Sequence, residues 1–164
     1  MEENPKWIIR EIENFDDKEL NNVLSSVMIE YGVPKKGTAL SDPELKKMSK
    51  AYQNSRSIYY VIIKNNKIFG GAGISQLKYS KENICELQKM YFLKQARGIG
   101  MGKKMIETCL HKAKKFGYKK CYIETMYNME SAQKLYLKQG FSYINHPMGN
   151  TGHSSCPVWM LKKL

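Results

Sequence analysis

The chain has 164 residues, of which 42% are hydrophobic, so it can bury one core, and we expect a single domain over residues 1–164. No stretch approaches the roughly 18 apolar residues of a membrane span, and the first residues lack the basic and apolar regions of a signal peptide. These features disfavour a membrane protein and predict a soluble, cytoplasmic one.

The net charge of +12 is compatible with an anionic small molecule, an acidic partner or a nucleic acid. The lysines are dispersed, however, and many fall on the expected solvent faces of helices, so a solvated surface with a groove for an anionic cofactor is favoured. The sole hint of the interleaved basic and aromatic residues typical of a nucleic-acid binder is Arg56 beside Tyr59 and Tyr60. Nucleic-acid binding is therefore the least favoured reading.

The four cysteines, Cys85, Cys109, Cys121 and Cys156, show no C-x-x-C pair and no histidine at a zinc-ligand spacing. We expect reduced thiols and no metal.

Hydrophobic periodicity predicts the elements of the first half of the chain. In order they are a strand at 7–12, a helix at 16–31, a helix from 42 to about 53, a hairpin of strands 57–63 and 67–75, and a strand at 84–93. The second half then alternates helix and strand. These elements are helices at 100–116 and 129–139 and strands at 119–125, 141–144 and 157–161.

A glycine-rich turn, R-G-I-G-M-G-K at 97–103, directly follows a predicted strand and opens a helix. Glycines let backbone N–H groups converge, and a helix N-terminus adds partial positive charge, so this turn suits a pyrophosphate. Glycines in such a place can also serve only a tight turn. Lys103 occupies the place of the third glycine of a dinucleotide-binding motif, and no Lys-Ser or Lys-Thr pair follows as in a P-loop.

Together with its flanks, this stretch resembles the acetyl-CoA signature of the GNAT superfamily of N-acetyltransferases. The family pattern L-Y-V-x-P followed by R-G-x-G-x-G has its counterpart in M-Y-F-L-K at 90–94 and the turn at 97–102, with Lys94 where the family usually has proline. A second family signature, A-x-x-L-Y-x-x-x-G-F, matches residues 132–141. The family's asparagine three residues before that alanine is replaced by Met129, and Asn128 lies one place earlier.

The resemblance implies an α/β fold with a mostly antiparallel sheet of about seven strands, about four flanking helices, and a splay between strands 4 and 5 that admits the pantetheine arm of acetyl-CoA. It implies no metal, and an acceptor that is a small-molecule or peptide amine. A homodimer is left open. The residues implied to bind the cofactor are Met90, Tyr91, Phe92, Arg97, Gly98, Ile99, Gly100, Met101, Gly102, Lys103 and Asn128.

The reaction implied is direct attack of the amine on the thioester through a tetrahedral intermediate. The resemblance favours Tyr136 as the acid that protonates the leaving thiolate, although a tyrosine on a helix is by default a packing residue. Glu86 is a candidate general base, since strand alternation predicts that it shares one face with Gln88 and Met90. It is equally interpretable as a cross-strand partner of a lysine, and a non-catalytic acyl-CoA-binding module of the same fold is the alternative function.

Overall fold

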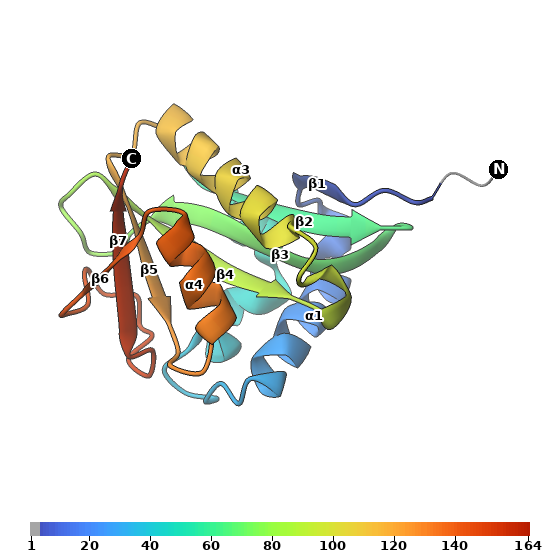
Figure 1. Ribbon diagram of the computed structural model, residues 1–164, viewed down its shortest axis with the longest axis horizontal. Coiled ribbons are helices and arrows are strands. Elements are labelled where there is room, and N and C mark those ends of the chain that lie inside the picture. Colours follow the sequence, from blue (N-terminus) through green and yellow to red (C-terminus); the bar gives the residue numbers. More distant parts are fainter. Residues whose placement is uncertain (1–3) are drawn as a thin grey trace.

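The computed structural model describes residues 4–164 and forms one seven-stranded mixed sheet with strand order β1-β2-β3-β4-β5-β7-β6 (Figure 1). Neighbouring strands are antiparallel except for the parallel pair β4 and β5. The mostly antiparallel α/β sheet expected from the sequence is therefore confirmed. The strands are β1 (Ile8–Glu11), β2 (Ile58–Lys64), β3 (Lys67–Gln76), β4 (Ile84–Phe92), β5 (Lys120–Thr125), β6 (Ser142–Ile144) and β7 (Val158–Lys163).

The helices cover both faces of the sheet, with α3 and α4 on one side and α1 on the other (Figure 1). Their apolar sides form two cores, one holding Met105 and Ile106 of α3 and the other Leu20 and Leu24 of α1. Within residues 4–164 no helix has the length and apolar character needed to cross a membrane. The α-helices are α1 (Asp17–Glu30), α2 (Met48–Ala51), α3 (Met101–Lys115) and α4 (Glu130–Lys138), and short 3-10 turns occupy Asn14–Asp16, Ala39–Ser41, Pro43–Lys46 and Lys94–Ala96.

The prediction of one continuous helix from 42 to about 53 is wrong. The chain instead forms a 3-10 turn at Pro43–Lys46, breaks at Lys47 (φ −139°, ψ 52°) and restarts as the four-residue α2. The backbone N–H of Ser49 donates to the Asp17 carboxylate at 2.8 Å, and the Ser49 hydroxyl donates to the same group at 2.6 Å. A tertiary contact with α1 therefore caps the second piece and replaces a helical hydrogen bond.

The parallel pairing of β4 with β5 is short. It joins three pairs of residues and ends at Glu86 opposite Tyr122, although β4 continues to Phe92 and β5 to Thr125. Beyond that point β5 pairs only with β7. The two central strands thus separate within the sheet, which confirms the predicted splay.

A β-bulge interrupts β4 at Lys89, which has a positive φ of 48°, and the register with β3 shifts at this point. A bulge adds one residue to a strand and reverses the alternation of faces beyond it. Met90 consequently packs with the core beneath α3, whereas Gln88 bonds to Tyr52 in the opposite core. The prediction that Glu86, Gln88 and Met90 share one face is therefore wrong for Met90, because alternation was assumed to be unbroken.

Candidate active site

A cavity of about 550 Å³ lies between the C-terminal end of β4, the glycine turn, α1 and α4. Its lining also includes Tyr31 of the chain after α1 and Ala132 and Leu135 of α4. Most of the residues predicted to bind the cofactor line this cavity, namely Met90, Tyr91, Phe92, Arg97, Gly98, Gly100, Gly102 and Lys103. Two distant signatures of the sequence, the glycine turn and the segment around Leu135, therefore meet at one cavity.

Three residues predicted to bind the cofactor do not line this cavity. The side chain of Ile99 is directed to solvent and that of Met101 is buried in the core. Asn128 donates from its amide to the carbonyl oxygen of Tyr31 at 2.7 Å, so it ties the β5–α4 loop to the end of α1. A cofactor contact of these three residues stays a prediction.

Glycine suits each position of the turn for a different physical reason. Gly98 and Gly100 have φ of 71° and 84°, a region that favours glycine, and a Cβ atom on either would meet no atom within 4 Å. A Cβ on Gly102 would lie 2.8 Å from Leu135 Cδ2, so this glycine permits close packing of α3 on α4. The N-cap of α3 is Gly100, which leaves the N–H groups of the first turn open to a ligand. An open turn with free N–H groups fits a pyrophosphate.

Arg97 attaches the turn to α1. Its Nε donates to the carbonyl oxygen of Phe92 at 2.8 Å, and its guanidinium donates to Glu30 at 2.7 Å and lies 5.2 Å from the ring centre of Tyr31. The hydrogen bond from Arg97 lowers the pKa of Glu30. In this arrangement Arg97 positions the wall of the cavity.

Three ionisable side chains converge where β4 and β5 separate. They are Glu86 of β4, Glu124 of β5 and His153 of the loop between β6 and β7, and their carboxylate and imidazole atoms lie within 4.8 Å of one another. Among the described residues this set offers ligand atoms suited to a metal ion, and its two carboxylates suit the ammonium group of an amine equally well. The expectation that no metal binds stays a prediction.

Glu86 is buried, with 5% of its surface exposed. Burial raises its pKa from the usual 4.5 to about 7; a hydrogen bond from Gln88 opposes this rise and the charge of Glu124 adds to it. The amide of Gln88 donates to Glu86 at 2.6 Å and accepts a hydrogen bond from the Tyr52 hydroxyl at 2.6 Å. Glu86 can therefore gain and lose a proton near neutral pH, as a general base must.

Glu124 and His153 are held by further hydrogen bonds. Glu124 accepts from the hydroxyls of Tyr122 at 2.9 Å and Thr151 at 2.8 Å, and burial raises its pKa. Burial, the largest single influence, lowers the pKa of His153, but the hydrogen bond to Asp42, at 2.9 Å from Nε2, together with the charges of Asp42 and Glu86 raises it above its usual value. The loop that carries Thr151 and His153 is thereby fixed against the sheet.

Sequence reasoning missed the ion cluster beside this site. The Lys89 ammonium lies 3.1 Å from Asp42 and 2.9 Å from Glu44, and 2% of its side chain is exposed. A lysine in the interior of a predicted strand, directly before Met90, was the available signal, since a buried lysine needs an acidic partner. Its partners come from residues 42–44, about 45 positions away, which no local pattern indicates.

Tyr136 lies on α4 with 5% of its surface exposed, and its ring packs edge-on against Phe141 with 6.0 Å between centres. Burial raises its pKa above the usual 10, so the hydroxyl keeps its proton at neutral pH. A protonated hydroxyl fits both a general acid and a packed aromatic residue.

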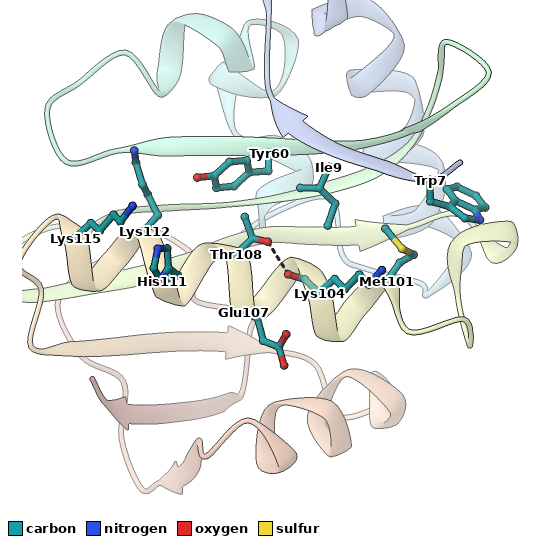
Figure 2. A pocket seen from close by; sticks show the side chains of 10 residues that line it. All are labelled: Trp7, Ile9, Tyr60, Met101, Lys104, Glu107, Thr108, His111, Lys112 and Lys115. Atoms are coloured by element: carbon teal, nitrogen blue, oxygen red, sulfur yellow. Dashed lines mark hydrogen bonds between the residues drawn. The ribbon is translucent and has the colours of Figure 1, made fainter. Parts of the chain in front are cut away.

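A second cavity, of about 580 Å³, lies between α3 and strands β1 and β2 (Figure 2). Figure 2 shows Trp7, Ile9 and Tyr60 on the strand side and His111 on α3. The carboxylate among its lining residues is Glu107, whose side chain is 52% exposed. None of the glycines of the turn and no buried acid line this groove, so the better candidate for the active site is the place where β4 and β5 separate.

Residues 25–141, more than half of the chain, match the family model described as the acetyltransferase (GNAT) family. The chain is also 37% identical over 158 residues to the uncharacterised N-acetyltransferase YjgM of Escherichia coli (strain K12), covering 96% of this chain and 95% of that protein. The chain belongs to the acetyltransferase (GNAT) family. The expected membership is confirmed, and this GNAT protein is an acyltransferase.

Solved structures of other GNAT proteins have the same fold. An acetyltransferase of the GNAT family from Staphylococcus aureus Mu50 superposes with a TM-score of 0.86 at 23% identity, covering 97% of this chain and 99% of that one. The PaiA N-acetyltransferase from Thermoplasma acidophilum, solved in complex with coenzyme A, gives a TM-score of 0.74 at 16% identity, with 97% and 99% covered. At these identities the likeness concerns the fold alone.

Proposed function

We propose that this protein transfers the acetyl group of acetyl-CoA to a primary amine by direct attack. The observation that carries the proposal is the meeting of two features at one place. An open glycine turn and cavity lie on one side of the separated strands, and Glu86, a buried carboxyl with a pKa of about 7, lies where β4 and β5 part.

The glycine turn and the C-terminal half of β4 support acetyl-CoA as the donor. The N–H groups of residues 98–103 would bind the pyrophosphate, and the backbone of Met90, Tyr91 and Phe92, which has no partner on the β5 side, would bind the amides of pantetheine. The coenzyme A complex of the Thermoplasma protein supports this choice. When bound, acetyl-CoA supplies a thioester whose C–S bond breaks as the amine nitrogen bonds to the acetyl carbon.

Glu86 would accept the proton that the amine loses, directly or through one water molecule. Gln88 holds the carboxylate from one side, and Glu124 and His153 lie around it. An amine attacks only in its neutral form, and a carboxyl with a pKa of about 7 is partly ionised at neutral pH, so it can accept the proton that the amine must lose. In the same reaction Tyr136 would give its proton to the departing thiolate and regain one from solvent.

A binding module without transfer activity remains the second candidate on the same fold. The charged form of a buried carboxyl is costly, so Glu86 is an unfavourable residue for a site that only binds. This observation favours catalysis over binding alone.

The test combines acetyl-CoA binding with turnover. Acetyl-CoA should raise the melting temperature, as a ligand of the native state does, and thiol release should depend on an added amine. Glu86→Gln should keep the melting shift and lose about 10²-fold in turnover, most strongly at low pH where the amine is protonated.

Glu11→Gln, which changes an exposed carboxylate of β1, is the matched control and should behave as wild type. Absence of a melting shift at saturating acetyl-CoA would refute the proposal. A melting shift without thiol release for any amine would support the binding module.

A further inference from the structure

The bulge in β4 sets the orientation of the three residues that follow it and line the cavity of the glycine turn. The register leaves one residue of β3, Ala72, against two residues of β4, Lys89 and Met90. Beyond the bulge Met90 and Phe92 pack with the core beneath α3, whereas Tyr91 packs with the opposite core. Unbroken alternation would exchange these two sets. It would also exchange the backbone N–H and C=O groups that the segment directs to the side of β5.

Lysine is an unfavourable residue for the position that it occupies in this bulge. The φ of Lys89 is 48°, in the left-handed region that residues with a side chain rarely adopt. Such a conformation persists only where the surrounding structure fixes it, and positions of this kind concentrate at functional sites. The bulge therefore needs anchors outside β4.

The side chain of Lys89 provides the first anchor. Its ammonium lies 3.1 Å from Asp42 and 2.9 Å from Glu44, and 2% of the side chain is exposed. Asp42 is held in turn by His153 at 2.9 Å. Because a buried charge is costly to separate from its partners, these contacts fix the side chain to the segment that precedes α2.

The main chain of Lys89 has a second anchor, which comes from β2. The hydroxyl of Tyr59, a fully buried residue, donates to the carbonyl oxygen of Lys89 at 2.7 Å. The Tyr59 ring crosses β3 to reach this oxygen, and a Cβ atom on Gly71 or Gly73 would lie 2.5 Å from the ring. The two glycines therefore make room for a hydrogen bond to a residue that has no partner in the β3–β4 register.

We propose that Lys89 is a positioning residue for acetyl-CoA. Anchored at its ammonium and at its carbonyl oxygen, it fixes the bulge that turns the backbone of residues 90–92 toward the pantetheine arm. Lys89 does not line the cavity of the glycine turn, so it acts through the three residues that follow it. The inference rests on the proposed function and adds to it a residue outside the groups that would touch the cofactor.

The experiment separates the two parts of the cofactor. Calorimetry measures the dissociation constants of acetyl-CoA and of adenosine 3′-phosphate 5′-diphosphate, at concentrations into the millimolar range for the latter. This nucleotide has the pyrophosphate of coenzyme A but no pantetheine. Binding is measured rather than turnover because the charge of Lys89 also acts on Glu86.

Lys89→Met keeps an unbranched side chain and removes the ammonium. It should weaken acetyl-CoA about tenfold, the effect of losing one or two hydrogen bonds to the pantetheine amides, and leave the nucleotide within about twofold of wild type. A merely structural role would not distinguish the two ligands.

Tyr59→Phe tests the second anchor and decides the question if Lys89→Met does not fold. It keeps the ring and removes the hydroxyl that bonds to Lys89, so it should weaken acetyl-CoA with the same selectivity. Asp16→Asn is the matched control, since it breaks the 2.7 Å ion pair of a buried carboxylate with Arg10 of β1. It should lower the melting temperature and leave both dissociation constants unchanged.

Equal weakening of the two ligands, or an unchanged affinity for acetyl-CoA, in either folded variant would overturn this inference and leave the proposed function intact. Failure of the wild-type protein to bind acetyl-CoA would overturn the proposed function and the inference with it.

Discussion

Glu86 illustrates how a single residue couples stability to chemistry. Its carboxyl binds a proton more tightly in the native protein, with a pKa of about 7, than at the usual value of 4.5. The stability linked to this group is therefore present below pH 4.5 and is lost as the pH rises through about 7. The loss amounts to roughly 3 kcal/mol at alkaline pH.

Glu86→Gln should consequently stabilise the protein at pH 8 by up to about 3 kcal/mol, and most of this gain should disappear at pH 5. Urea unfolding at the two pH values measures the difference. Glu107→Gln, which changes an exposed carboxylate, is the control and should alter the free energy of unfolding little. A gain of equal size at both pH values would contradict the raised pKa.

Tyr136 is the residue proposed to protonate the leaving thiolate, and its hydroxyl can be tested separately from its ring. Tyr136→Phe keeps the ring and its contact with Phe141, so folding and acetyl-CoA affinity should change little. Loss of general acid catalysis should lower kcat about 10²–10⁴-fold, with the lower end expected since water can replace the hydroxyl. Turnover within about threefold of wild type, where chemistry limits the rate, would make Tyr136 a packing residue against the pantetheine arm.

At the scale of elements, the glycine turn sets the entry to α3. Gly100 has a φ of 84° and its missing side chain leaves open space. Gly100→Val should abolish the acetyl-CoA melting shift, because valine disfavours this φ and its side chain would fill the proposed phosphate site. Gly117→Val is a matched control, since Gly117 has a φ of 83° and open space but lies at the far end of α3. Unchanged affinity for acetyl-CoA in Gly100→Val would move the phosphate site elsewhere.

At the scale of the whole molecule, Asp42 joins three distant segments. It accepts from His153 of the β6–β7 loop and pairs with Lys89 of β4, and both partners also interact with the charge of Glu86. Burial raises the pKa of Asp42, but the hydrogen bond from His153 and the charge of Lys89 outweigh it and lower the pKa. Because the pKa of His153 is raised, the stability contributed by its charged contact with Asp42 is fully present below pH 6.5. It is lost as the pH rises past the pKa of His153 in the native protein.

Backbone hydrogen exchange in the β6–β7 loop, corrected for its intrinsic pH dependence, should therefore speed up more than in the rest of the chain as the pH rises past the raised pKa of His153. Asp42→Asn should remove this pH dependence and leave the loop unprotected throughout. Equal protection of the loop in wild type and variant would show that the contact does not hold it. The core strand β3 serves as the internal reference, because it is largely buried.

The sequence by itself determined the order and type of nearly every element, the glycine turn before α3 and the family, because each depends on local periodicity and on motifs a few residues long. For the same reason it predicted the cavity walls at Met90 to Phe92 and in the glycine turn, where only Ile99 and Met101 do not line the cavity. Only the tertiary structure decided the break in the second helix, the bulge at Lys89 and the face that Met90 covers. Each of these depends on a partner far along the chain, such as Asp17 for Ser49 or Asp42 for Lys89. The pKa of Glu86 likewise depends on burial and on Glu124 of another strand, and only folding creates those surroundings.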